Sequence, residues 1–176
     1  MSTLCDFQIR QLARDTGLIE PYNPEQLNPA SYDVTLGNTI LFEEREDAPY
    51  HETVEANRWK EFDISKTPYM LPPGGFILAV TSEFIRLPGS IEAIFCLKSS
   101  RGREGWNHAL AAYCDPGFHG RVTLELKNYN QYQYLKVQAG MRIGQLRFSK
   151  MDQIPGRPYS LTGRYMNDEG VQISRG

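Results

Sequence analysis

Apolar residues recur along the chain in two patterns, one helical and one typical of strands. Near the start, Ile9 and Ala13 are spaced so that they lie on one side of a helix, which we expect over residues 6–16. Asp6 stands where it can cap the first turn, and Gly17 follows at a position where helices commonly end. Residues 1–20 are therefore expected to form a short N-terminal helical region.

The rest of the chain is typical of short strands separated by turns. SYDVTLGNTILF, residues 31–42, is rich in β-branched residues and holds a Gly-Asn pair that predicts a turn. In RVTLEL, Leu124 and its apolar neighbours alternate with Thr123 and Glu125, so the two sets face opposite ways. Residues 43–63 are charged and aperiodic, which predicts a surface excursion or short strands. Further strands are expected in FILAV (76–80), IEAIFCLKS (91–99), NHALAAY (107–113), HGRVTLELKN (119–128) and YLKVQAGMRIGQLRFSKM (134–151).

This succession predicts a mainly β fold, a sandwich or barrel of the jelly-roll type, and the length of 176 residues suits one domain over 1–176. Residues 155–176 are polar and predict an arm that closes over the domain. The three cysteines form no C-x-x-C pair, which argues against a disulfide scaffold and a zinc site. The N-terminus lacks an apolar signal core and no run reaches membrane-span length, so we expect a cytoplasmic protein without membrane contact.

Charge changes this picture locally. The net charge is −2, but residues 96–150 hold nine basic and three acidic side chains, net +6. A small basic segment in a nearly neutral protein favours a compact anionic ligand over a nucleic-acid polymer. Sequence patterns of P-loops, Rossmann folds, hydrolase elbows and zinc deaminases are absent from the chain.

Two segments carry candidate chemistry. KSSRGREG, residues 98–105, gathers hydroxyls and cations around glycine, a combination suited to phosphate oxygens. In DPGFHGRVTLEL, residues 115–126, Glu125 lies among apolar neighbours on the expected strand. Burial there would raise its pKa, which suits a general base near neutral pH. An ion pair between Glu125 and a lysine or arginine across the strand is the alternative, and the sequence leaves both open.

Together these segments resemble the dCTP deaminase family. SYDVTLGN, KSSRGREGW, DPGFHGRVTLELKN and AGMRIGQLRF occur in that family's order, and the helix LCDFQIRQL and the ending RYMNDEGVQISR are similar to its two ends. The resemblance implies a distorted jelly roll of the trimeric dUTPase type with a short N-terminal helix. It also implies a homotrimer with shared active sites, no zinc or other protein-bound metal, and Mg²⁺ carried by the nucleotide phosphates.

The resemblance also implies roles for single residues. Glu125 matches the catalytic base, Arg103 the arginine that orients it, and Ser99 the serine that holds the attacking water. The family's base-recognition alanine falls on Ala111 or Ala112, and counting back from Asp115 favours Ala111. The substrate-binding positions implied in this way are Lys98, Ser100, Arg101, Ala111, Asp115, Thr123, Leu124, Tyr159, Arg164 and Asp168.

This chain departs from the family's pattern at the phosphate-binding positions. Lys98 stands where an arginine is usual, and Asp168 and Glu169 stand where glutamines are usual. Two carboxylates beside a triphosphate are unfavourable unless Mg²⁺ or an arginine compensates them, so a shorter phosphate chain is an alternative.

Three functions remain after these considerations. The first is zinc-independent deamination of dCTP to dUTP and ammonia. The second is hydrolysis at the phosphate chain, by a bifunctional deaminase forming dUMP or by a dUTP/dCTP pyrophosphatase. The third is a nucleotide-sensing protein without catalysis, against which the set Ser99, Arg103 and Glu125 argues.

Overall fold

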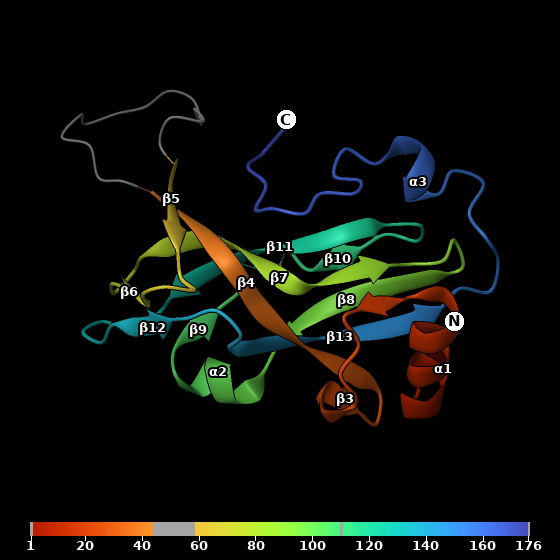
Figure 1. The fold of residues 1–176 in the computed structure, drawn as a ribbon, viewed down its shortest axis with the longest axis horizontal. Coiled ribbons are helices and arrows are strands. Elements are labelled where there is room, and N and C mark those ends of the chain that lie inside the picture. Colours follow the sequence, from red (N-terminus) through yellow and green to blue (C-terminus); the bar gives the residue numbers. More distant parts are fainter. Residues whose placement is uncertain (1, 44–58, 110, 176) are drawn as a thin grey trace.

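The computed structural model describes residues 2–43, 59–109 and 111–175. It is mainly β, as the sequence predicts, and its main sheet curls around the core (Figure 1). Hydrogen-bonded neighbours follow the order β10 (Tyr113–Cys114), β8 (Ile91–Leu97), β13 (Arg142–Lys150), β4 (Ser31–Glu43), β7 (Phe76–Arg86), β11 (His119–Asn128) and β9 (Trp106–Asn107).

Shorter elements extend this sheet at its margins. β1 (Ser2–Thr3) pairs with β13, β2 (Ile19–Glu20) with β7, and β3 (Leu27–Asn28) and β5 (Trp59–Asp63) with β4. β6 (Tyr69–Leu71) and β12 (Leu135–Val137) form a separate pair. The helical elements are α1 (Asp6–Thr16), α2 (Ser99–Arg103), α3 (Tyr159–Thr162) and the 3₁₀ turn η1 (Pro24–Gln26). Among the described residues, no helix is long and apolar enough to cross a membrane.

Several predicted elements differ from the observed ones. The prediction of one strand over 107–113 is wrong, because only its two ends lie in strands, β9 and β10, which pair with different partners. Of the charged segment at 43–63, residues 59–63 form β5, and residues 44–58 lie outside the described residues. The N-cap of α1 is Cys5, in a capping box with Gln8, so the prediction that Asp6 caps the helix is wrong. Gly17 ends α1 in a left-handed conformation, as predicted.

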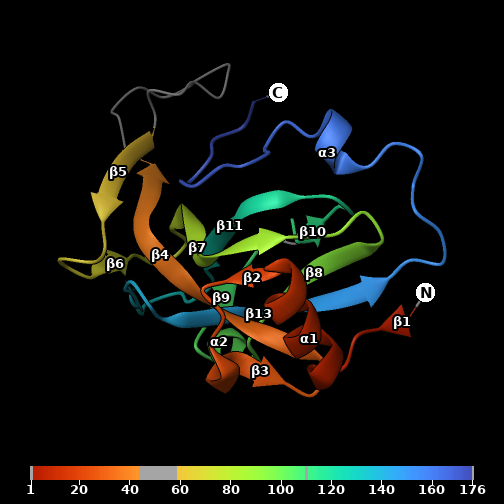
Figure 2. The same ribbon diagram turned by 45° about the vertical axis from the view of Figure 1, so that its right-hand side comes forward.

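The predicted turn at the Gly-Asn pair is also wrong, because β4 runs through it. The first half of β4 pairs with β13, its second half pairs with β5 and β7, and the register shifts between Leu36 and Ile40. A Cβ atom on Gly37 would lie 2.9 Å from Val80 Cγ1. Glycine therefore allows a close strand contact where β4 changes partners, and Figure 2 shows β4 running from the side of β5 to the side of β3.

Gly144, near the start of β13, gives a testable packing prediction. A Cβ atom there would lie 2.1 Å from Phe95 Cε2, and Phe95 is fully buried. We expect Gly144→Ala to lower the free energy of unfolding by about 2 kcal/mol, because Phe95 has to leave its position in the core. Denaturant titration measures this, with Gly156→Ala as control, since nothing lies within 4 Å of its Cβ position. Equal stabilities of the two variants would contradict the packing argument.

Candidate functional site

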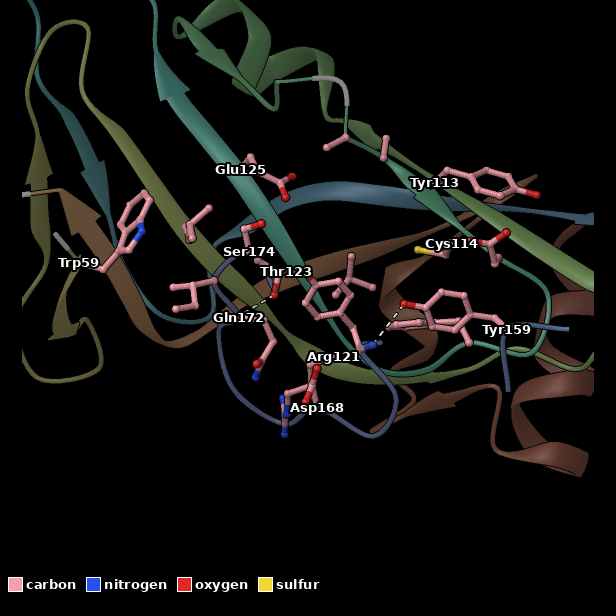
Figure 3. Close-up of a pocket in the computed structure, with 18 residues that line it drawn as sticks. Trp59, Tyr113, Cys114, Arg121, Thr123, Glu125, Tyr159, Asp168, Gln172 and Ser174 are labelled. Carbon is pink, nitrogen blue, oxygen red and sulfur yellow. Dashed lines mark hydrogen bonds between the residues drawn. The ribbon is translucent and has the colours of Figure 1, made fainter. Parts of the chain in front are cut away.

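A cavity of about 730 Å³ opens between β11, β10 and the C-terminal arm, residues 155–176 (Figure 3). Strand β11 supplies its floor. Because side chains alternate along a strand, Arg121, Thr123 and Glu125 face the cavity. Leu124 is 2% exposed and lies in the hydrophobic core instead. The alternation predicted for this strand is confirmed by its burial pattern.

Glu125 lies in this cavity with an unsatisfied oxygen. Its Oε2 is buried and has no hydrogen-bond partner among the described residues. Burial is the main cause that raises the pKa of its carboxyl, and a backbone hydrogen bond acts in the opposite direction. On the neighbouring strand β7, the residue opposite Glu125 is Leu78, which is apolar. The ion pair considered as an alternative is not formed within the described chain, so the geometry favours a base.

A tight turn leads into β11 and shapes one end of the cavity. The Phe118 amide donates to the Asp115 carbonyl at 3.0 Å, and Gly117 has a φ of 85°, a conformation that favours glycine. Asp115 and Ala111 both line the cavity. Cys114 lines it as well, but burial raises the pKa of its thiol to about 12, so it stays protonated and unreactive.

The C-terminal arm is bound to β11 by backbone hydrogen bonds. Asp168 forms a parallel bridge with Gly120, and the Arg121 amide donates to the Asp168 carbonyl at 2.9 Å. Further along the arm, the backbone amide of Gln172 donates to Thr123 Oγ1 at 3.2 Å. The arm therefore lies against the same strand that presents Glu125 (Figure 3). Tyr159 and Asp168 of the arm line the cavity, whereas Arg164 does not.

The basic segment that precedes β9 lies elsewhere. Residues 99–103 form α2, and its Ser99, Ser100 and Arg103 are exposed. Lys98 Nζ pairs with the buried Asp33 Oδ2 at 2.6 Å, and Arg101 pairs with Glu104 at 2.7 Å. None of these basic and hydroxyl residues lines the cavity that holds Glu125. Within one chain, then, the structure separates the two halves of the site that the sequence indicated.

Other cavity residues were missed by sequence reasoning. Arg121 could have been found, because it alternates with Thr123 and Glu125 on one strand. Tyr165 and Gln172 carry no such signal, since only the docking of the arm brings them to the cavity. Trp59 lines the cavity from β5, far away in sequence. Within the described ranges, no group of three or more His, Cys, Asp or Glu side chains could hold a metal ion.

Comparison with known proteins places this geometry in context. The family model described as dCTP deaminase-like matches residues 3–151. A "dCTP deaminase, dUMP-forming" from Coprothermobacter proteolyticus is 37% identical, and the alignment covers 98% of this chain and 95% of that protein. A protein of the same name from Persephonella marina is also 37% identical, covering 98% and 96%. The crystal structure of 2′-deoxycytidine 5′-triphosphate deaminase from Agrobacterium tumefaciens is similar with a TM-score of 0.67 and 26% identity, over 84% of this chain but only 47% of that chain.

Proposed function

The chain belongs to the dCTP deaminase-like family and is an enzyme acting on dCTP, and we propose that it converts dCTP to dUMP. The relatives named above are described as dUMP-forming. These names support a bifunctional deaminase that forms dUMP, which was the second function considered from the sequence. They do not support an enzyme that releases dUTP. The observation that carries the chemistry is the buried, unpaired Glu125 oxygen in the cavity.

In the proposed first step Glu125 is the general base. Its carboxylate takes a proton from water, and the water oxygen bonds to C4 of cytosine. The electrons of the C4–N3 double bond move to N3, which takes this first proton. The second proton of the water then passes through Glu125 to the 4-amino group, the C4 carbonyl forms as the exocyclic C4–N bond breaks, and ammonia leaves. The raised pKa of Glu125 suits both transfers, because a stronger base accepts the proton more readily and still returns it near neutral pH.

In the proposed second step a further water attacks the α-phosphorus, the bond to the bridging oxygen breaks, and pyrophosphate leaves dUMP behind. Asp115 lines the cavity and would position this water. Thr123 would lie along the sugar, and Tyr159 and Asp168 of the arm would contact the phosphate chain. The substrate would thus extend along β11 from Glu125 toward the arm.

We further propose that a second copy of the chain completes each site in a homotrimer. Ser99 and Arg103, which the family resemblance assigns to catalysis, are exposed on α2 and do not line their own chain's cavity. We therefore infer that these exposed side chains act at the cavity of another copy. In a ring of three chains the contacts are heterologous, so one surface of each chain meets a different surface of the next.

Mg²⁺ fits this site as a companion of the nucleotide. When bound it neutralises phosphate charge, and it is commonly held by one or two carboxylates in addition to phosphates. Asp168 Oδ2 is a buried carboxylate oxygen in the cavity wall without a hydrogen-bond partner in the described residues. Asp168 is therefore the residue best placed to contact the cation.

The products distinguish the alternatives directly. We expect dCTP with Mg²⁺ to yield ammonia, dUMP and pyrophosphate in equal amounts, measured by chromatography and a pyrophosphate assay. Incubation with dUTP and with dCMP in parallel shows whether either step proceeds alone. Accumulation of dUTP without pyrophosphate would overturn the dUMP proposal, and nucleotide binding without any product would favour the sensing alternative.

A further inference from the structure

Asp168 introduces negative charge where an anionic substrate is expected. Its side chain is 16% exposed and lines the cavity. One of its oxygens, Oδ2, is buried without a partner among the described residues. An uncompensated carboxylate in such a position repels phosphate oxygens, and the repulsion is strong where water is scarce. Binding of a nucleoside triphosphate therefore requires that a nearby group offset this charge.

Arg175 provides that group from the far end of the arm. Its Nη2 lies 3.0 Å from Asp168 Oδ1, which leaves Oδ2 as the free oxygen. The same nitrogen donates to Gln172 Oε1 at 2.6 Å. The Arg175 guanidinium thus links one carboxylate oxygen of Asp168 to the side chain of Gln172. The backbone amide of Gln172 in turn donates to Thr123 on β11.

Arg175 also closes the arm on itself. Its Nη1 donates to the Arg164 carbonyl, and its guanidinium carbon lies 4.9 Å from the centre of the Tyr165 ring. Its backbone amide donates to Tyr165 Oη at 2.9 Å. A planar guanidinium has five N–H donors in a fixed fork, so it can make these hydrogen bonds and the ring contact at once. Residues 164–175 are therefore folded into a loop whose ends meet at one side chain.

We propose that Arg175 is a positioning residue of the nucleotide site, which offsets the charge of Asp168 and fixes the arm from Arg164 to Arg175 against the cavity. This inference rests on the proposed function, because the ligand it serves is the triphosphate of dCTP. It assigns no chemical step to Arg175, which acts through Asp168 and the arm. Loss of Arg175 is harmful mainly because it leaves the Asp168 charge uncompensated.

The coupling between the two residues is the test. Binding of dCTP is measured by calorimetry without Mg²⁺, so that no cation offsets the Asp168 charge, and in a Glu125→Gln background, where deamination is blocked. We expect Arg175→Ala to weaken binding about tenfold, because a charge-assisted contact is lost and a carboxylate is left unpaired. Adding Asp168→Asn should bring binding back to within about threefold of the parent, because the repulsive charge is then gone. Arg157→Ala is the matched control, since Arg157 is an exposed arginine of the same arm.

Turnover gives an independent readout. With Glu125 intact, Arg175→Ala should raise KM for dCTP about tenfold and leave kcat within about threefold, because the reacting atoms are untouched. Equal weakening in Arg175→Ala and in the double variant would overturn the proposal, as would unchanged binding in Arg175→Ala. Failure of the proposed function has a different signature: the wild-type chain would release no ammonia, while the coupling in binding would still be measurable.

Discussion

Replacement of Glu125 by glutamine is expected to reduce ammonia release from dCTP by at least about 10³-fold, because glutamine cannot take a proton from the attacking water. The amide has nearly the shape of the carboxylate, so the cavity is preserved and dCTP should still bind. Ammonia release under saturating dCTP measures the loss. Glu61→Gln is the matched control, since Glu61 is an exposed glutamate of β5, and it should retain full activity.

Thermal unfolding separates a catalytic role of Glu125 from a structural one. Burial raises the pKa of Glu125, so the folded chain binds this proton more tightly than the unfolded chain does. The protonated Glu125 side chain therefore adds to the free energy of unfolding at low pH. This contribution is lost as pH rises through the raised pKa. At neutral pH, Glu125→Gln should therefore leave the melting temperature unchanged or raise it. A lower melting temperature together with lost activity would indicate that Glu125 holds the fold rather than acts as base.

Two inactive variants are expected to restore activity to each other if sites are shared between copies. Arg103→Ala alone should lose at least about 100-fold in ammonia release, because Arg103 is assigned to orient the base. In trimers that contain both this variant and Glu125→Gln, about a third of the sites would combine an intact Glu125 with an intact Arg103 from the neighbouring copy. Coexpression with two different tags isolates the mixed trimers, and their activity measures this fraction.

The control for this experiment is a pair of variants that cannot complement. Trimers mixed from Glu125→Gln and Glu125→Ala contain no intact base and should remain inactive. Isolated mixed trimers of the Arg103 and Glu125 variants that also stay inactive would show that both residues serve the same chain's site. The exposed position of Arg103 on α2 would then require a movement of that helix.

Secondary structure could be predicted from the sequence wherever one side of an element is buried. The helix over residues 6–16 and the strand over residues 119–128 are confirmed at those bounds, because their apolar residues repeat at the helical and strand periods. The turn predicted at Gly37 failed because glycine there serves a close contact with Val80, which lies far away in sequence. A local signal cannot distinguish these two uses of glycine.

The sequence by itself determined the mainly β fold and the family, and it singled out Glu125 as the candidate base, a role that stays a proposal. Each of these follows from local alternation or from ordered motifs. Only the tertiary structure decided that Lys98 is bound to Asp33, that α2 lies away from its own chain's cavity, and that Arg175 pairs with Asp168. These are contacts between side chains from separate segments, and their geometry depends on how strands pair and where the arm binds. The charge count along the chain showed that residues 96–150 are basic, but it could not show which carboxylates these basic side chains pair with.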